Sequence, residues 1–209
     1  MKTASDLQTP TAAGRETAES LLDAAERLLV QVGHGGITTR RLAAEAGANQ
    51  GLVHYYFGSI DELFVQVLER FTERLIARQR EMYETDLPFI EKWRTAWRYQ
   101  EQDLEAGYPK IWMELQALSW NRPDLRPRIA RVNAEWRAVL HDAFERGATE
   151  YDLAEDEFPV EAMVSLMMTF GQGYMVERLE GIEQGHAELL AWIERWLEGL
   201  EEKRTRRTE

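Results

Sequence analysis

Four residues near position 50 are of types that can contact double-stranded DNA. Gln50 can form a bidentate hydrogen bond with an adenine edge, and Gly51, which lacks a side chain, allows a close backbone approach. His54 and Tyr55 can donate to phosphate oxygens or to base acceptors. At helical spacing these residues share the outer face of one short helix, so the stretch suits the major groove.

A second group of residues, just upstream, could hold the DNA backbone. Thr38 and Thr39 would place hydroxyl and amide groups at the start of a helix, where the helix dipole favours a phosphate. Arg40 adds a fixed positive charge beside them. Asn49 is a suitable cap for the helix that carries Gln50.

Three short helices must position these groups. The first, within 15–32, has apolar residues at helical spacing and ends at Gly33. The second starts at Thr38 and the third at Asn49, and Gly47 between them can adopt the left-handed conformation of a tight turn. This arrangement is a helix-turn-helix, although a plain three-helix bundle with a polar surface would give a similar pattern.

The rest of the chain also has helical periodicity. We find no alternating strand and no internal repeat, so the predicted fold class is all-α with about nine helices. Ser59 and Glu62 form a capping-box pattern at the start of a long helix, and Gly147 is expected to act as a stop. The further predicted helices cover 59–83, 89–106, 109–119, 124–147, 157–182 and 186–203.

Composition narrows the class of protein. The chain of 209 residues is 44% hydrophobic and 30% charged and contains no cysteine, which fits a globular protein without disulfides. The net charge is −12, but residues 1–60 carry only −1 of it, so the acidic character lies outside the predicted DNA-contact region. No apolar run could span a membrane and residues 1–14 do not resemble a signal peptide, so we expect a disordered N-terminal arm and a cytoplasmic location.

Residues 15–75 resemble the N-terminal DNA-binding domain of TetR-type transcriptional regulators. The match is ordered and free of gaps, and it consists of 24–29, 36–43, 46–51, 56–59 and 62–63. The resemblance implies a helical homodimer that represses transcription from a palindromic operator and is released by a small ligand. The predicted DNA-binding residues are Thr38, Thr39, Arg40, Asn49, Gln50, Gly51, His54, Tyr55 and Tyr56.

Two positions depart from the family pattern. The family usually has Lys where this chain has Ile60, so a phosphate contact is lost and the salt dependence of DNA binding should be weaker. His54 stands where the family often has Tyr, a change that can alter base preference.

The predicted second domain, residues 76–209, is rich in large aromatic side chains. These could line a pocket in which a few polar groups orient a small hydrophobic or aromatic effector, or they could be ordinary core residues. Acidic neighbours such as Glu101 and Asp103 would favour a cationic, lipophilic ligand, although helix surfaces are often acidic. The predicted ligand-binding residues are Trp93, Trp97, Gln100, Trp112, Gln116, Trp120, Trp136, Phe170 and Tyr174.

The last two predicted helices each carry an apolar stripe. Two copies of this helix pair could form a four-helix bundle across a two-fold axis, or the stripes could pack within one chain. We expect the dimer, because a helix-turn-helix needs two copies to bind a palindrome. The predicted interface residues are Met163, Met167, Phe170, Gly171, Tyr174, Leu189, Ile193, Trp196, Leu197 and Leu200.

Enzymatic interpretations find little support in the sequence. Glu183 and His186 have the spacing of di-iron ligands, but there is one copy and Gly185 interrupts it. His141 and Asp142 have no evident metal-ligand partners, and no phosphate loop or nucleophile elbow is present. We therefore expect no enzyme, no metal and no cofactor. The alternative function is a constitutive DNA-binding or protein-interaction module without an effector.

Overall fold

The computed structural model describes residues 12–208, and these are helical with no strand, as predicted. They divide into two compact units, residues 1–69 and 70–209, a few residues before the boundary expected at 75. The first helix begins at Ala12, so residues 12–14 are helical and not part of an arm. The rest of the predicted arm, residues 1–11, lies outside the described residues.

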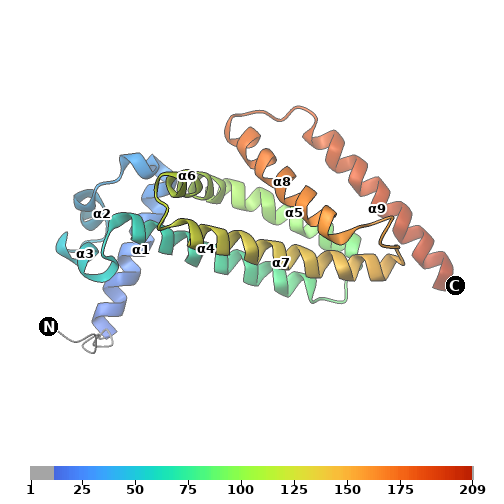
Figure 1. Ribbon diagram of the computed structural model, residues 1–209, viewed down its shortest axis with the longest axis horizontal. Coiled ribbons are helices and arrows are strands. Elements are labelled where there is room, and N and C mark those ends of the chain that lie inside the picture. Colours follow the sequence, from blue (N-terminus) through green and yellow to red (C-terminus); the bar gives the residue numbers. More distant parts are fainter. Residues whose placement is uncertain (1–11, 209) are drawn as a thin grey trace. The chain divides into compact units, whose positions relative to one another are not determined.

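The first unit consists of three helices and the beginning of a fourth (Figure 1). Helix α1 (Ala12–Val32) packs its apolar face against the short helix α2 (Thr39–Glu45), and α2 in turn contacts α3 (Gly51–Phe57). The single 3-10 turn, His34–Gly36, connects α1 to α2. Fully buried residues from each helix form the core: Leu21, Leu29, Leu42, Val53 and Leu63.

The short helices of this unit are defined by local signals that the sequence contains. The Thr38 hydroxyl accepts a hydrogen bond from the Arg41 amide at 3.2 Å, which caps α2. Ser59 Oγ accepts from the Glu62 amide at 3.1 Å, the first half of the predicted capping box, and α4 (Ile60–Tyr83) begins there. These caps satisfy backbone groups that would otherwise lack partners at the helix ends.

The second unit contains the end of α4 and five further helices (Figure 1). α7 and α8 pack along each other, while α5 contacts α6 and α9. The buried core draws on α4, α5, α7, α8 and α9 and is rich in aromatic rings. The helices are α5 (Phe89–Glu105), α6 (Tyr108–Asn121), α7 (Arg126–Tyr151), α8 (Val160–Leu179) and α9 (His186–Thr208).

Gly147 does not end a helix, contrary to the sequence-based expectation. It lies inside α7, which continues to Tyr151 and ends at Asp152 in the left-handed conformation, with φ of 56°. A Cβ at position 147 would lie 2.8 Å from Cδ2 of Phe89. The glycine is therefore needed for the close packing of α5 on α7, and helical hydrogen bonding tolerates it.

Among residues 12–208, no helix combines the length and the apolar character that crossing a membrane requires.

Candidate functional site

The turn between α2 and α3 has the geometry of a helix-turn-helix. Gly47 takes a φ of +63°, and the Ala48 amide donates to the Ala43 carbonyl at 2.8 Å, which closes the turn. Asn49 Oδ1 accepts from the Gly51 amide at 2.9 Å and so caps α3, as predicted. Ser20 Oγ donates to the Ala46 carbonyl at 3.2 Å and ties the turn to α1.

The predicted DNA-binding residues lie largely on the surface of this unit. Tyr55 is 78% exposed, and Thr39 and Tyr56 are half-buried. The exposed members of the set are Thr38, Arg40, Asn49, Gln50, Gly51, His54 and Tyr55. The neighbours Val53 and Phe57 are buried, so α3 is anchored by one face and presents the other to solvent.

The second unit contains a partly open cavity of about 150 Å³. Its walls come from α4, α5, α6, α7 and α8, and they are mostly aromatic and methionine side chains. The lining residues are Gln79, Tyr83, Trp93, Ala96, Trp97, Gln100, Asp103, Tyr108, Trp112, Trp136, Val139, Leu140, Phe144, Met167, Met168, Gly171, Gln172 and Met175.

Five of the predicted ligand-binding residues line this cavity: Trp93, Trp97, Gln100, Trp112 and Trp136. Four others do not. Phe170 and Tyr174 lie one layer behind, with ring centroids 5.9 and 5.3 Å from that of Trp97. Gln116 is half-buried elsewhere on α6, and Trp120 is 65% exposed, so neither reaches the cavity.

The predicted ligand-binding set did not include Gln79 and Tyr83, two polar residues of the cavity wall, whereas Asp103, which was named for its charge, does line the cavity. Gln79 Oε1 is buried and has no hydrogen-bond partner. The Tyr83 phenol is buried, which raises its pKa well above the usual value of 10.0. Gln79 and Tyr83 share one face of α4 with the apolar Ile76, a signal that helical spacing could have supplied.

Asp103 carries the charge of the cavity wall. Arg78 Nη2 donates to both of its carboxylate oxygens, at 2.8 and 2.7 Å, and the guanidinium lies 4.1 Å from the centroid of the Tyr99 ring. Burial raises the pKa of Asp103 despite this partner, which acts in the opposite direction. Arg78 is not among the lining residues, so the carboxylate end of the pair faces the cavity.

Other polar groups near the cavity bond to one another. The Tyr108 hydroxyl lies 3.1 Å from Thr72 Oγ1, and Trp136 Nε1 donates to it at 3.3 Å. Behind the cavity, Tyr174 donates to Glu101, and Arg178 binds the same carboxylate at 3.0 Å. Burial and the Glu101 carboxylate raise the pKa of Tyr174 to about 12.

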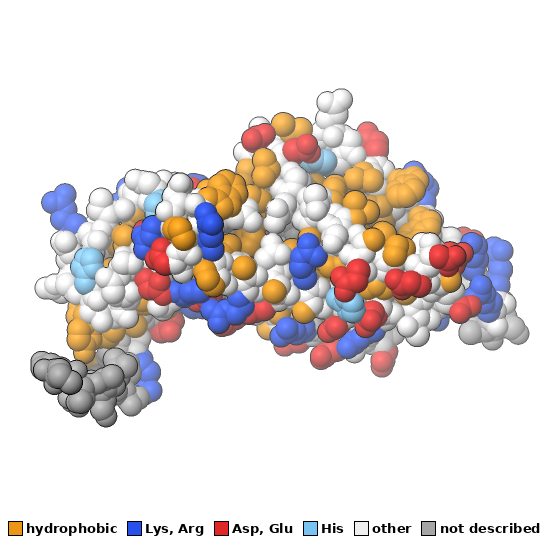
Figure 2. Space-filling view, in the orientation of Figure 1, with side chains coloured by type: hydrophobic (Ala, Val, Ile, Leu, Met, Phe, Trp, Pro, Cys, Tyr) orange, Lys and Arg blue, Asp and Glu red, His pale blue; other side chains and the backbone are white. Residues whose placement is uncertain are grey.

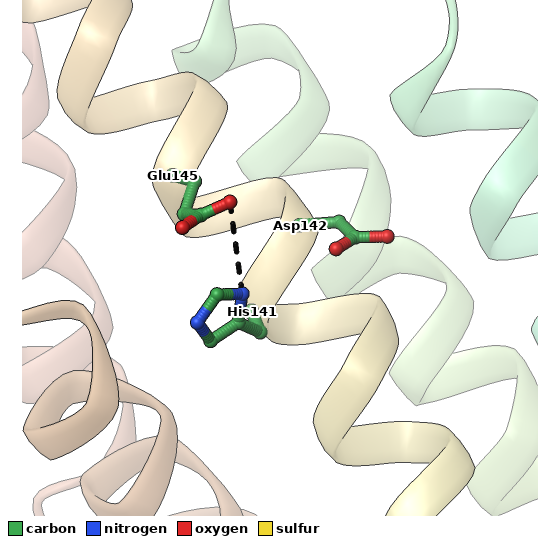
Figure 3. Close-up of side chains that lie close together, drawn as sticks. All are labelled: His141, Asp142 and Glu145. Carbon is green, nitrogen blue, oxygen red and sulfur yellow. Dashed lines mark ion pairs between the residues drawn. The ribbon is translucent and has the colours of Figure 1, made fainter.

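The His141–Asp142 pair has more neighbours than the sequence suggested. Glu145, one turn further along α7, lies 3.7 Å from His141 Nδ1 (Figure 3). Glu161 of α8 lies 3.3 Å from Nε2 of the same ring. The ligand atoms of His141, Asp142 and Glu145 lie within 4.8 Å of one another. Glu145 and Glu161 are 61% and 81% exposed, so this cluster is a solvated set of ion pairs.

The predicted dimer stripe only partly faces outward. Tyr174, Leu197 and Leu200 are 2%, 2% and 9% exposed and pack within the chain, while Met167 and Gly171 line the cavity. Large apolar residues of α8 and α9 that the prediction did not include are exposed, among them Leu166, Leu179 and Trp192. Figure 2 shows apolar side chains gathered over these helices. The outward apolar face consists of Leu166, Val176, Leu179, Ile182, Leu189, Trp192 and Trp196.

Comparisons with known proteins agree with this geometry. Residues 21–67 match the family model for bacterial regulatory proteins of the tetR family. A curated HTH-type transcriptional regulator of Haemophilus influenzae, itself uncharacterized, is 26% identical over 142 residues, which cover 68% of this chain and 74% of that protein.

Solved structures share the fold. A TetR-family transcriptional regulator from a Rhodococcus species has a TM-score of 0.69 at 22% identity, with 86% of this chain and 97% of that one covered. A transcriptional regulator from Saccharomonospora viridis, solved in complex with choline, has a TM-score of 0.67 at 17% identity, with 90% and 96% covered.

The fold and the surface of α3 thus define a DNA-binding regulator with a helix-turn-helix domain. The helix-turn-helix domain of this chain is of the TetR type, since residues 21–67 match that family model.

Proposed function

We propose that this chain is a cytoplasmic repressor that binds a palindromic operator as a homodimer and is released by a small hydrophobic or aromatic effector. The observation that carries the proposal is the pairing of two features in one chain: an exposed polar face on α3 and a buried aromatic cavity in the second unit.

The chemistry of the α3 face supports sequence-specific DNA binding. Gln50 can bond to an adenine edge, Tyr55 can bond to bases or phosphates, and His54 can bond to bases. Arg40 is exposed near the start of α2 and supplies positive charge for the DNA backbone. The acidic surface of the second unit would favour approach of DNA to the first unit alone.

The outward apolar face supports the homodimer. An exposed cluster that includes Trp192 and Trp196 is unusual on the surface of a monomer and is typical of a protein interface. A two-fold axis would present two copies of α3 to half-sites about one DNA turn, or a multiple of it, apart.

The cavity supports a small-molecule effector. Aromatic and methionine walls with a few polar groups are the usual composition of a ligand pocket. The Saccharomonospora viridis regulator, which has a similar fold, was solved with choline, so proteins of this architecture can hold a small organic molecule. A module without an effector remains the alternative, since a core can contain a cavity that binds nothing.

Gel-shift titration against the DNA upstream of the gene itself tests DNA binding. The double variant Gln50→Ala, Tyr55→Ala should abolish the sequence-specific shift and leave the oligomeric state unchanged. Gln116→Ala, a half-buried glutamine away from both sites, is the matched control. Unchanged operator binding by the double variant would overturn the assignment of α3.

Adding choline and single-ring aromatic compounds to the bound complex separates the two functions. Release of the operator by one of them supports a ligand-responsive repressor. A complex that survives all of them, while the protein also fails to bind any of them, supports the constitutive alternative.

A further inference from the structure

The cavity wall contains a hydrogen-bond acceptor that lacks a donor. Gln79 is 8% exposed, lines the cavity, and its Oε1 has no hydrogen-bond partner. A buried acceptor without a partner destabilises the folded protein. That destabilisation is offset when a bound molecule donates the missing hydrogen bond from an N–H or O–H group.

The charged residue of the cavity wall is acidic. Asp103 is the acidic residue among the lining residues, and no Lys or Arg is among those that the structure describes there. Its partner Arg78 approaches the carboxylate from outside the lining set, at 2.7 and 2.8 Å. The burial that raises the pKa of Asp103 also means that solvent does little to stabilise its charge. An anionic guest would therefore be repelled, whereas a cation would compensate the carboxylate.

The aromatic rings of the wall also favour a cationic guest. Trp93, Trp97, Trp112 and Trp136 line the cavity, and the faces of indole rings attract cations more strongly than those of other aromatic side chains. Trp136 Nε1 is already bonded to the Tyr108 hydroxyl, so its N–H is not available to a guest's acceptor. The wall therefore combines indole rings with the Gln79 and Asp103 acceptors, beside donors such as the amides of Gln100 and Gln172.

The volume limits the size of the guest. A cavity of about 150 Å³ is similar to an engineered protein cavity that holds benzene. We propose, on the basis of the proposed effector function, that this cavity binds a protonated amine of about one aromatic ring in size, whose N–H donates to Gln79 Oε1 and whose charge faces Asp103 and the indoles.

Four probes with a single aromatic ring separate charge from hydrogen bonding. Benzylamine is the cation with N–H donors, benzyl alcohol is neutral, benzoate is an anion, and benzyltrimethylammonium is a cation without an N–H. We expect isothermal titration calorimetry of the full-length protein without DNA to show that benzylamine binds at least about tenfold more tightly than benzyl alcohol and benzyltrimethylammonium. Benzoate should not bind. Equal affinity for the alcohol, or tighter binding of benzoate, would overturn the proposal.

Two substitutions assign the residues. Gln79→Leu removes the acceptor and should weaken the binding of benzylamine about tenfold or more. The variant protein should still fold, because the substitution removes an unpaired polar atom. Asp103→Asn should bring benzylamine close to benzyl alcohol in affinity. Gln116→Leu, outside the cavity, is the matched control and should change nothing. Benzylamine binding that Gln79→Leu leaves unaltered would contradict the site.

The gel shift keeps this proposal distinct from the proposed function. If benzylamine binds in the cavity and the operator complex survives, the ligand class stands and the release mechanism is wrong. If a neutral aromatic compound releases the operator and benzylamine does not bind, the regulator stands and the ligand class is wrong.

Discussion

His54 Nδ1 lies 3.0 Å from the carbonyl oxygen of Gly58, the residue that caps the end of α3. A carbonyl oxygen can only accept, so Nδ1 carries the proton in this arrangement. In the neutral ring Nε2 is then an acceptor. The backbone therefore sets which kind of base edge this exposed histidine can recognise: one that presents a donor, such as the amino group of adenine or cytosine.

His54→Phe should change operator preference and leave non-specific DNA affinity nearly unaltered. The phenyl ring keeps the shape but removes the acceptor, and one such contact is worth about 1–3 kcal/mol of discrimination between bases. Selection from random oligonucleotides, followed by competition with unrelated DNA, measures both quantities. His34→Phe is the control, because it makes the same substitution at a histidine outside the predicted DNA-binding set. His34 packs edge-on against Phe64, with ring centroids 5.3 Å apart. Identical selected sequences for wild type and His54→Phe would count against a base contact.

Trp192→Glu should convert a dimer to a monomer. Trp192 is 60% exposed on the outward apolar face, and a carboxylate there would be buried without a partner in a dimer. Sedimentation velocity at several protein concentrations measures the change. Trp120→Glu makes the same substitution at a residue that is 65% exposed on α6 and should leave the oligomeric state alone. A shift in both variants, or in neither, would argue for a different interface.

Gly147→Ala should destabilise the protein by about 1–3 kcal/mol, although alanine favours helices. The new Cβ would lie 2.8 Å from the Phe89 ring, which has little room to move because it packs against Phe144 and Tyr151 at 6.3 and 6.2 Å. Chemical denaturation measures the loss. Combining it with Phe89→Leu should cost less than the sum of the two single changes. Strict additivity would mean that the two residues do not constrain each other.

Glu201→Gln should lower stability modestly, and the difference should fade in acid. Hydrogen bonds from Arg204, at 2.6 and 3.1 Å, lower the pKa of Glu201 from 4.5. A lowered carboxyl pKa gives stability that is complete above the unfolded pKa and is lost as pH falls through the folded pKa. Urea denaturation from pH 7 to pH 3 should therefore show wild type and variant converging below about pH 4.5.

Glu202→Gln is the control for that measurement. Glu202 pairs with Arg206 at 3.3 Å, but both side chains are largely exposed, so solvent screens the pair. Its effect should be smaller than that of Glu201→Gln. A Glu201→Gln difference that stays constant down to pH 3 would show that this pair does not contribute through its charge.

The helices were predictable because their ends depend on local chemistry. Thr38, Asn49 and Ser59 cap helices in the structure as their sequence positions indicate. Gly47 adopts the positive φ that the turn requires. Gly147 was misjudged because a helical glycine and a terminal glycine look alike in the sequence. Only its neighbour from α5, some sixty residues distant along the chain, distinguishes them.

The faces of the last helices were harder to predict. A helix such as α8 has apolar residues on more than one side, because it borders both the core and the solvent. Periodicity identifies apolar positions but not which partner covers each of them. The same limit explains why Gln79 was missed as a ligand contact: polar residues are usually exposed, and only tertiary packing shows that this one lines a cavity.

Three methionines, Met167, Met168 and Met175, form one side of the cavity wall. Thioether chains are unbranched and change rotamer easily, so they can reshape around molecules of different outline. The indole rings that also line the cavity are rigid. We expect a wall with one flexible part and one rigid part to select guests by charge more than by shape, so that a whole chemical class of compounds would bind.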